Sequence, residues 1–181
     1  MLDATQPWGR RVRPYVSTHV HAQIAKEAWQ VAAYFGLRAR IFAGEQQMFS
    51  GSDRDEQDAI AWPIVALSTK FGMDDEVVGV VRIFPAGAGA WYGGRLGVDP
   101  GYRAHGGVGT ALIECAVSSA HALGCSRFLA TVQERNVRYF ERHHFRALEA
   151  IELRSRPHRL MEADLSYFPP SSALAAFTRA A

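Results

Sequence analysis

The stretch around which this chain is organised lies at residues 96–113 and reads Leu-Gly-Val-Asp-Pro-Gly-Tyr-Arg-Ala-His-Gly-Gly-Val-Gly-Thr-Ala-Leu-Ile. An apolar helical pattern continues from it to residue 122, so the order is strand, turn, glycine cluster and helix. Gly106, Gly107 and Gly109 bring bare backbone to the first turn of that helix. There the first N–H groups have no intrahelical partner and the helix dipole is positive. Such a segment is suited to bind a phosphate or pyrophosphate.

The side chains around the glycines support anion binding and exclude two common nucleotide motifs. Arg103 and His105 add cationic or donor groups before the glycines, and Thr110 adds a hydroxyl after them. A structural turn that merely uses glycine is the alternative, but three glycines in four positions after an arginine favour an anion site. A Walker loop needs Gly-Lys-Ser/Thr, and the stretch has no lysine. A dinucleotide fingerprint fails because Leu112 stands at its third glycine and residues 125–132 contain no acid.

Length and composition indicate one ordinary globular domain. The chain has 181 residues, of which 48% are hydrophobic and 21% charged, and its formal net charge is +2. At this size roughly 70% of the unfolded surface can be buried, so stability requires neither a metal nor a disulfide. We expect a single domain over residues 1–181, with its core at about residues 11–165 and a C-terminal tail at residues 166–181.

The same features exclude several classes of partner. The net charge of +2 is too small to indicate nucleic-acid binding. No apolar run approaches the roughly 20 residues of a membrane span, and no charged and then apolar leader opens the chain. Cys115 and Cys125 are interpreted as small buried hydrophobes in a reducing compartment. We therefore expect a cytoplasmic protein that binds neither nucleic acid nor a membrane.

The hydrophobic pattern predicts strands that alternate with helices. The predicted strands cover residues 11–20, 59–67, 76–84, 91–98, 126–132, 145–153 and 158–165. The predicted helices cover residues 21–35, 37–44, 107–123 and 135–143. The strand–helix–strand order around residues 107–123 implies a parallel, right-handed crossover. The expected fold class is therefore α/β, with six to seven strands and about four helices.

Three parts of this pattern carry local signals. Five of the nine residues at 50–58 are charged, which indicates a solvated turn or a mobile flap. Pro63 confines its strand to an edge position or a bulge. Gly93, Gly94 and Gly97 lie inside the fourth predicted strand and indicate a bulge or the close approach of a ligand. Simple alternation would place on one face of that strand Trp91, Gly93, Arg95 and Gly97.

The glycine segment resembles the acyl-coenzyme A pyrophosphate loop of the GNAT N-acetyltransferases, in which Arg/Gln-x-x-Gly-x-Gly/Ala opens a helix. Counting back from Gly107 and Gly109 places the Arg/Gln position on Ala104, with Arg103 one residue earlier. Either the loop carries one extra residue, or Arg103 reaches in from a shifted position. The backbone cradle depends on the glycines and is unaffected.

A second segment, at residues 133–145, reads Gln-Glu-Arg-Asn-Val-Arg-Tyr-Phe-Glu-Arg-His-His-Phe. It resembles the second GNAT signature, in which an Asn precedes a short helix that bears Phe-Tyr and ends in Gly-Phe. The resemblance implies that Asn136 offers its amide to the pantetheine arm and that Arg142 reaches a coenzyme phosphate. The two signatures together identify the chain as a member of the GNAT family, with similarity from residue 37 to residue 165.

The second segment departs from the family pattern at two positions. Phe140 occupies the tyrosine position, with Tyr139 directly before it, and His144 occupies the glycine position. More narrowly, three runs resemble a subfamily of N-acetyltransferases that is named after nitrogen starvation and encoded beside nitrilases. These runs are Trp-Tyr-Gly-Gly-Arg-Leu at 91–96, Cys-x-Arg-Phe-Leu-Ala-Thr-Val-Gln at 125–133 and Pro-His-x-Leu-Met at 157–161.

The resemblance implies the GNAT acyl-CoA fold, a mixed α/β sheet whose strand before the coenzyme loop is splayed. An extended pantetheine arm pairs with the exposed backbone there, and the thioester carbonyl is polarised by a backbone N–H near Val98. The resemblance implies an N-acetyltransferase that uses acetyl-CoA as co-substrate, needs no metal and acts on a small-molecule primary amine. A homodimer is compatible with it. The implied coenzyme contacts are Leu96, Gly97, Val98, Arg103, Ala104, His105, Gly106, Gly107, Val108, Gly109, Thr110, Asn136, Tyr139, Phe140 and Arg142.

The resemblance also suggests catalytic groups. An amine of pKa near 10 is mostly protonated at pH 7 and must lose a proton before it attacks. The strand at residues 91–98, on or near which the family often carries an acid, has none, so Glu45 is the nearest base by analogy. It ends the run Leu-Arg-x-x-Ile-Phe-x-x-Glu-Gln at residues 37–46, which resembles an element found after the first helix of several acetyltransferases. A charged helix end is the alternative for that run. Tyr139 is the candidate for protonating the leaving thiolate.

The acceptor site and two rival functions complete these expectations. Arg38, Arg82 and Arg95 suit an acceptor that bears a carboxylate, although surface charge is the alternative for each, and Trp91 is the fourth acceptor-site candidate. None of the seven histidines has a partner at ligand spacing, so no metal site is expected. Two functions stay open beside acetyl transfer. One is a non-catalytic acyl-CoA sensor on the same fold; the other is a transferase like the acyl-homoserine-lactone synthases, which would prefer acyl-carrier protein.

Overall fold

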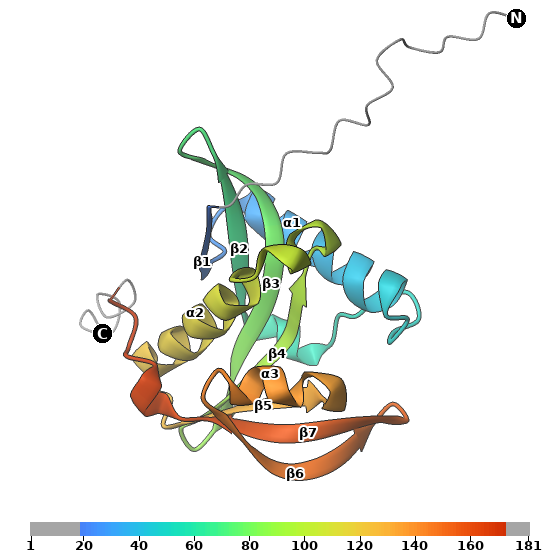
Figure 1. Cartoon of the computed structure of the whole chain (residues 1–181), viewed down its shortest axis with the longest axis vertical. Helices are drawn as coiled ribbons and strands as arrows, with labels where there is room; N and C mark the ends of the chain where they lie inside the picture. The colour runs from blue at the N-terminus through green and yellow to red at the C-terminus, as the bar shows by residue number, and fades with distance from the viewer. Residues whose placement is uncertain (1–18, 173–181) are drawn as a thin grey trace, which may run out of the picture.

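The computed structural model describes residues 19–172, which form one seven-stranded sheet in the order β1-β2-β3-β4-β5-β7-β6 (Figure 1). The strands are β1 (Val20–Ile24), β2 (Trp62–Lys70), β3 (Met73–Gly87), β4 (Ala90–Val98), β5 (Arg127–Gln133), β6 (Phe145–Leu153) and β7 (Arg156–Ala163). The helices are α1 (Ala28–Arg38), α2 (Val108–Ala122) and α3 (Val137–Glu141), with a π-helical turn η1 (Ala39–Glu45) and a 3₁₀ turn η4 (Glu134–Asn136). β4 and β5 are parallel and are joined through α2, whereas the other neighbouring strands are antiparallel. The α/β class and the crossover are therefore confirmed.

The first helix begins later than the sequence predicts. The residues before it form β1, which pairs antiparallel with β2, and α1 starts only at Ala28. Glu27 and Gln30 form a capping box that defines this start. The predicted helix over residues 21–35 was wrong at its beginning, because pairing with a neighbouring strand overrides local helical propensity.

Two further details differ from the sequence-based expectations. α1 passes through Gly36 and runs directly into η1, so this glycine does not separate two helices. β2 is not an edge strand, because it lies between β1 and β3. Pro63 lies near the beginning of β2, one residue beyond the part of the strand that pairs with β1. The Pro63 carbonyl still accepts a hydrogen bond from the Ala25 N–H, so the proline is tolerated there. The strand predicted over residues 11–20 lies almost wholly outside the described residues.

A β-bulge in β4 confirms the signal of its glycines and changes which face each residue occupies. Arg95 has a φ of 55°, and the register with β3 shifts at this point so that two residues of β4 oppose one of β3. A Cβ at Gly93 would meet Phe128 on the α2 side, whereas a Cβ at Gly97 would meet Ile41 on the α1 side. The predicted alternation, with both glycines on one face, is therefore wrong beyond the bulge.

The sheet opens between β4 and β5. Their parallel pairing covers only four residue pairs and ends at Gly93 and Ala130, so the rest of β4 continues without β5 beside it. Figure 1 shows the result as two parts of one sheet, β1–β4 above and β5–β7 below. This divergence agrees with the splayed strand that the resemblance implies.

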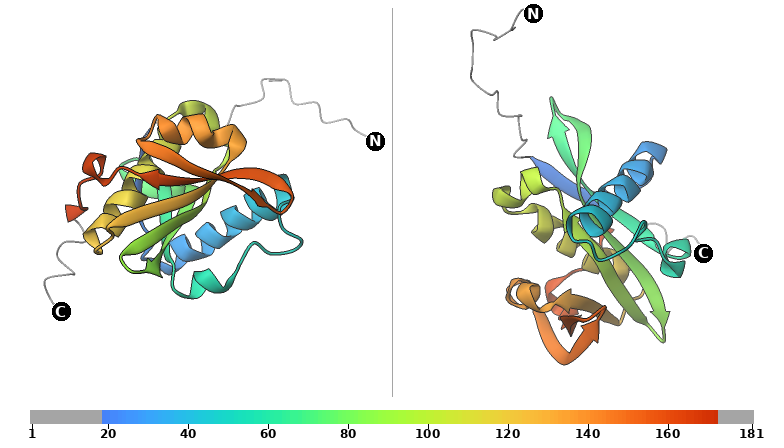
Figure 2. Two further views of the ribbon diagram at one scale, coloured as in Figure 1. Left: turned by 90° about the horizontal axis from the view of Figure 1, so that it is seen from below. Right: turned by 90° about the vertical axis from the view of Figure 1, so that its right-hand side faces the viewer.

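Helices cover both faces of the sheet and create two hydrophobic cores (Figure 2). α1 and η1 pack on one face, where Tyr34, Leu37 and Ile41 are each 1% exposed. α2 packs on the other face and buries Leu112 completely. Phe168 is also buried against this second core, so the described part of the predicted polar tail is anchored to the domain. Within residues 19–172 no helix is long and apolar enough to cross a membrane.

Candidate active site

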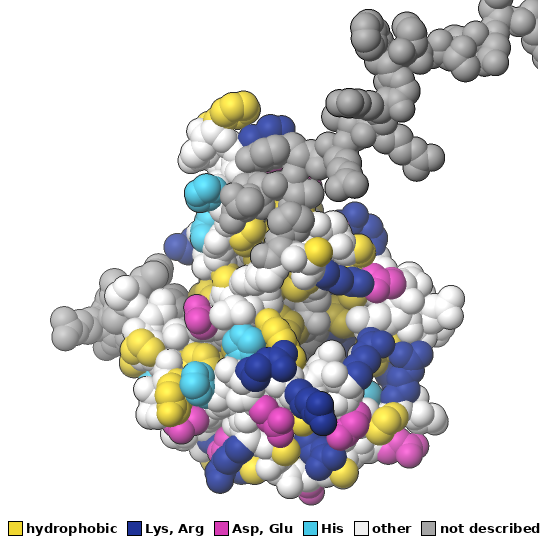
Figure 3. All heavy atoms as spheres, in the orientation of Figure 1, with side chains coloured by type: hydrophobic (Ala, Val, Ile, Leu, Met, Phe, Trp, Pro, Cys, Tyr) yellow, Lys and Arg dark blue, Asp and Glu magenta, His cyan; other side chains and the backbone are white. Residues whose placement is uncertain are grey.

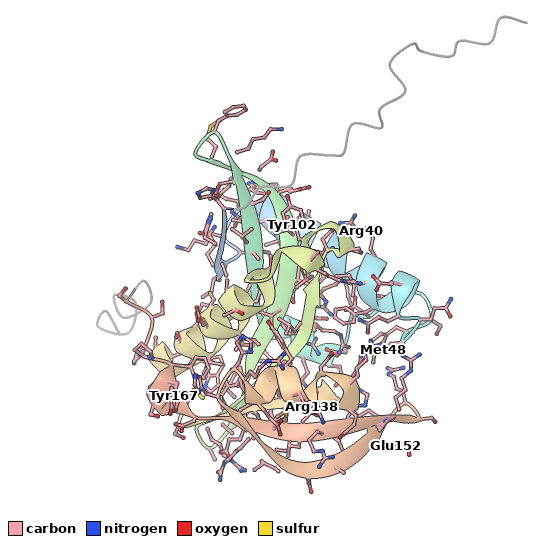
Figure 4. The ribbon with its side chains drawn as sticks, viewed as in Figure 1. Arg40, Met48, Tyr102, Arg138, Glu152 and Tyr167 are labelled. Carbon is pink, nitrogen blue, oxygen red and sulfur yellow. The ribbon has the colours of Figure 1, made fainter. Side chains whose placement is uncertain are left out.

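A cavity of about 320 Å³ lies where β4 and β5 separate, and its two walls differ in chemistry. The wall on the α2 side is apolar and includes Ile113, Ala116, Val117, Phe128, Phe140 and Phe145. The wall on the α1 side carries polar and aromatic groups, including Met48, Phe49, Arg82, Arg95, Arg154 and His158. Figure 4 shows Met48 in the loop that follows η1, and Arg138 on α3. The cavity is thus open to an apolar ligand from one face and to a polar ligand from the other.

The glycine loop beside this cavity has the geometry of an anion cradle. Gly106 and Gly107 adopt φ values of 56° and 98°, and a Cβ on either would meet nothing within 4 Å. The first helical hydrogen bond of α2 runs from the Ala111 N–H to the Gly107 carbonyl. The three preceding N–H groups therefore have no partner within the helix, and no side chain of the described chain caps Gly107.

The third glycine has a different environment. A Cβ at Gly109 would lie 2.5 Å from the hydroxyl oxygen of Tyr139, so this glycine makes room for the tyrosine. The Tyr139 ring packs on His143, whose Nε2 lies 2.8 Å from the Thr110 hydroxyl. Tyr139 and Phe140 point in different directions, because Phe140 lines the cavity while Tyr139 packs against the start of α2. This group joins α3 to the glycine loop.

Arg103 and Glu45, both predicted site residues, bind each other. The two terminal nitrogens of Arg103 lie 2.6 and 2.7 Å from the two carboxylate oxygens of Glu45, and its Nε donates to the Val98 carbonyl. The hydrogen bonds from Arg103 hold the pKa of Glu45 below its usual range. Glu45 is not among the described residues that line the cavity.

Arg38 is buried in an ion-pair cluster with the acidic loop at residues 50–58. All five of its N–H groups donate, to Asp53, to Asp58 and to the Tyr34 hydroxyl, and its side chain is 0% exposed. Contact with an acceptor would require one of these bonds to break. Most residues of this loop are exposed, as predicted for a solvated turn, but Asp53 departs from the prediction. It is 2% exposed, because Arg38 and Arg95 from distant parts of the chain pair with its carboxylate.

Arginine partners lower the pKa of two carboxyl groups of this loop, those of Asp55 and Asp58. Burial alone would raise the pKa of Asp58, but hydrogen bonds from Arg38 and Arg82 outweigh burial and lower it to about 2. The folded pKa lies below the ordinary value of 3.8, so Asp58 stabilises the fold above about pH 4. That contribution is lost as the pH falls toward 2.

Arg82 and Arg95 reach both the acidic loop and the cavity. Arg82 donates from its terminal nitrogens to Asp55 and Asp58, and Arg95 donates to Asp53 and Asp55. The Nε of Arg82 is buried and has no hydrogen-bond partner among the described residues. It lies 3.8 Å from the position of a Cβ on Gly94, and both residues line the cavity. An oxygen of a bound acceptor would satisfy this donor.

The remaining predicted residues divide between the cavity and its surroundings. Asn136 and Leu96 line the cavity, whereas Trp91 is 8% exposed and belongs to the hydrophobic core. Arg142 lines a second hollow, of about 460 Å³, together with Thr110. Figure 3 shows basic side chains gathered on this face of the molecule, over α3 and the β6–β7 hairpin. The side chain of His105 lies outside the described part of the chain.

Sequence reasoning missed part of the α1-side wall. Phe49 lies between two guanidinium groups, with Arg95 at 4.4 Å and Arg154 at 4.2 Å from its ring centre. Gln133, the last residue of β5, donates to Gln46 and to the Met48 sulfur. These contacts join segments far apart in the chain, and no local pattern could have revealed them. Within residues 19–172 no group of three or more His, Cys, Asp or Glu side chains could hold a metal ion.

Comparison with known proteins decides the family. The sequence model of the acetyltransferase (GNAT) family matches residues 27–145, which include α1, the splayed strand β4 and the whole glycine loop. The chain belongs to the GNAT acetyltransferase family. No curated protein matches this GNAT chain.

Solved structures share the GNAT fold at low sequence identity. An N-acetyltransferase candidate from Lactobacillus plantarum is 20% identical, with a TM-score of 0.69 over 80% of this chain and 97% of that chain. An acyl-CoA N-acyltransferase from Pseudomonas aeruginosa is 20% identical, with a TM-score of 0.65 over 81% and 99%. Escherichia coli ElaA is 21% identical, with a TM-score of 0.65 over 81% and 99%. At such identities these similarities support the fold.

Proposed function

We propose that this GNAT acetyltransferase transfers an acetyl group from acetyl-CoA to the primary amine of a small molecule. The observation that carries the proposal is that one helix, α2, lines the cavity at the β4–β5 opening from Ile113 onward and begins at an uncapped glycine loop. An acyl thioester and a phosphate-bearing carrier would need these two features next to each other. Family membership supports acyl-CoA-dependent N-acyl transfer in general.

The coenzyme is proposed to lie along the α2 side of the opening. Its pyrophosphate would accept hydrogen bonds from the free N–H groups of Val108, Gly109 and Thr110. Its pantetheine arm would pair with the part of β4 that continues without β5, and the Asn136 amide would reach it from the cavity wall. The apolar wall formed by α2 and β5 suits the acyl end of this ligand.

The acceptor is proposed to approach from the α1 side, where Arg82 and Arg95 lie. An amine nitrogen would attack the thioester carbonyl directly, the C–S bond would break, and the thiolate would leave with its electron pair. The free Nε of Arg82 supports an acceptor that carries an oxygen anion, such as a carboxylate. Arg38 would act indirectly, by anchoring the acidic loop against which these arginines pack.

A panel of small amines, with and without a carboxylate, tests this function. Release of free coenzyme A thiol would be measured for each amine at saturating acetyl-CoA, with coenzyme binding followed separately by calorimetry. The alternative is a non-catalytic acyl-CoA sensor, favoured by Phe140 in place of tyrosine and by the pairing of Glu45 with Arg103. A sensor would bind the coenzyme without turnover. The nitrogen-starvation subfamily, the cytoplasmic location and a homodimer stay predictions from sequence.

Replacement of Arg103 by alanine is expected to weaken acetyl-CoA binding by roughly 1.5–3 kcal/mol, if the guanidinium turns from Glu45 to the pyrophosphate. The loss should shrink with added salt, because the contact is exposed. Calorimetric titration measures both effects. Glu45→Gln is the matched control, since it frees Arg103 and should leave the affinity equal or higher. A loss of only a few tenths of a kcal/mol would mean that the backbone N–H groups alone bind the anion.

Removal of the Tyr139 hydroxyl is expected to have a small effect on turnover. In Tyr139→Phe, kcat should fall less than about tenfold, short of the roughly 10²–10⁴ expected for a general acid, because this hydroxyl packs on Gly109 outside the cavity. Phe140→Tyr should preserve or raise turnover, because Phe140 does line the cavity. A hundredfold drop in Tyr139→Phe at unchanged acetyl-CoA affinity would assign the acid to Tyr139.

A further inference from the structure

His158 is a buried titratable group of the cavity wall that the proposed transfer has not yet used. It lies near the beginning of β7, is 4% exposed and lines the cavity. In the register of the sheet it stands opposite Gln133 of β5, and directly paired residues point to the same face. The Gln133 side chain contacts Met48 on the α1 side. His158 therefore faces the wall from which the acceptor is proposed to approach, at the end of β5 that has separated from β4.

The hydrogen bonding of His158 determines which ring nitrogen is free. Its Nδ1 lies 2.8 Å from the carbonyl oxygen of Arg156. A carbonyl oxygen only accepts hydrogen bonds, so Nδ1 must carry the hydrogen. The Nε2 of the neutral ring then keeps a lone pair, and it has no hydrogen-bond partner among residues 19–172. The ring is thus arranged as a proton acceptor.

The other polar groups of the cavity cannot take this role. Three guanidinium groups line it, from Arg82, Arg95 and Arg154, and none of the described lining residues is Asp or Glu. Tyr92 also lines it, but a phenol holds its own proton near neutral pH. Glu45 lies outside the lining and has both carboxylate oxygens bound to Arg103, which makes it a weaker base. Imidazole is the side chain that exchanges protons near neutral pH.

We propose that His158 is the general base of the transfer, an assignment that rests on the proposed function. Its Nε2 accepts one proton from the acceptor ammonium, and the freed nitrogen lone pair forms the C–N bond with the thioester carbonyl carbon. When the C–S bond breaks, sulfur keeps the electron pair and receives the second proton of the former amine nitrogen. The products are the amide, the coenzyme thiol and one proton, which the imidazolium returns to water.

The test compares wild type, His158→Gln and the control His21→Gln, in which the replaced histidine lies on the edge strand β1 and contacts Asp74. Thiol release from acetyl-CoA is measured with a carboxylated benzylamine, 4-(aminomethyl)benzoate, whose amine is protonated at pH 7, and with a carboxylated aniline, 4-aminobenzoate, whose amine is not. In His158→Gln, kcat with the benzylamine should fall about 10²–10⁴-fold. With the aniline it should fall less than about tenfold, because no ammonium proton has to be removed. Acetyl-CoA affinity should stay within about twofold, and His21→Gln should match wild type.

A second measurement needs no acceptor. Nitrogen-15 NMR of histidine-labelled wild type, assigned with His158→Gln, should show the hydrogen of this ring on Nδ1. A hydrogen on Nε2 would overturn the assignment. An equal loss of turnover with both amines in His158→Gln would also overturn it, because such a loss indicates a structural role for His158. If the wild-type protein binds acetyl-CoA but acetylates neither amine, the result contradicts both the assignment of His158 as base and the proposed transfer to an amine. If the wild-type protein does not bind acetyl-CoA at all, the proposed function itself is contradicted. Calorimetry on the wild-type protein detects this outcome before any variant is made.

Discussion

Gly107→Val is expected to reduce acetyl-CoA binding at least about 100-fold in a chain that stays folded, a loss of roughly 2.7 kcal/mol or more. The residue precedes the first turn of α2, and a Cβ there would point into open space within the proposed pyrophosphate cradle. A β-branched side chain would fill that space and resist the φ of 98° that the loop requires. Calorimetric titration with acetyl-CoA, beside a thermal melt, measures binding and folding separately.

Gly87→Val is the matched control for this variant. Gly87 has a φ of 86° and equally open surroundings, but it is the last residue of β3, directly before the turn to β4. Both variants should lose about 1–3 kcal/mol of stability from backbone strain, whereas only Gly107→Val should lose binding. Unchanged affinity in folded Gly107→Val would remove the coenzyme from this loop. Gly109 is a poorer test position, because any side chain there meets the Tyr139 hydroxyl.

Asp53→Ala is expected to lower the free energy of unfolding by about 3–5 kcal/mol. Asp53 accepts from Arg38 at 2.7 Å and from Arg95 at 3.2 Å, and it is 2% exposed. Its removal leaves the fully buried Arg38 charge short of a partner, which costs far more than the loss of a surface pair. For a domain of this length the melting temperature should fall by roughly 6–20 °C.

Asp55→Ala serves as the control, because the Asp55 side chain is 37% exposed although it belongs to the same cluster. Its cost should stay near 1 kcal/mol. Chemical denaturation of both variants at neutral pH gives the comparison. An Asp53→Ala variant no less stable than Asp55→Ala would show that water or a shifted side chain compensates Arg38, and that the acidic loop is not needed to anchor it.

Much of the fold was predictable because its signals are local. The glycine cluster before α2, the apolar stripes of that helix and the strands on either side lie within one short stretch of chain. Their order alone requires a parallel crossover. The glycines of β4 likewise predicted a distorted strand. The distortion that the structure shows is the bulge at Arg95 and the separation from β5. The hydrophobic periodicity of most helices and strands is also local, which is why most elements were found. The start of α1 and the faces of β4 beyond its bulge were not found, because strand pairing decides both.

The tertiary structure alone decided which groups meet. Arg38 and Asp53 pair across 15 residues, Arg82 and Asp55 across 27, and Arg103 and Glu45 across 58. The sequence therefore offered three arginines for an acceptor and one glutamate for a base. Folding pairs the three arginines with aspartates of the acidic loop and the glutamate with Arg103. The sequence by itself determined the family, the sheet order around α2 and the backbone cradle, because these depend on backbone conformation over consecutive residues. Only folding placed His158 at the cavity, because β7 lies between β5 and β6 in the sheet and carries it beside the end of β5, some 25 residues earlier in the chain.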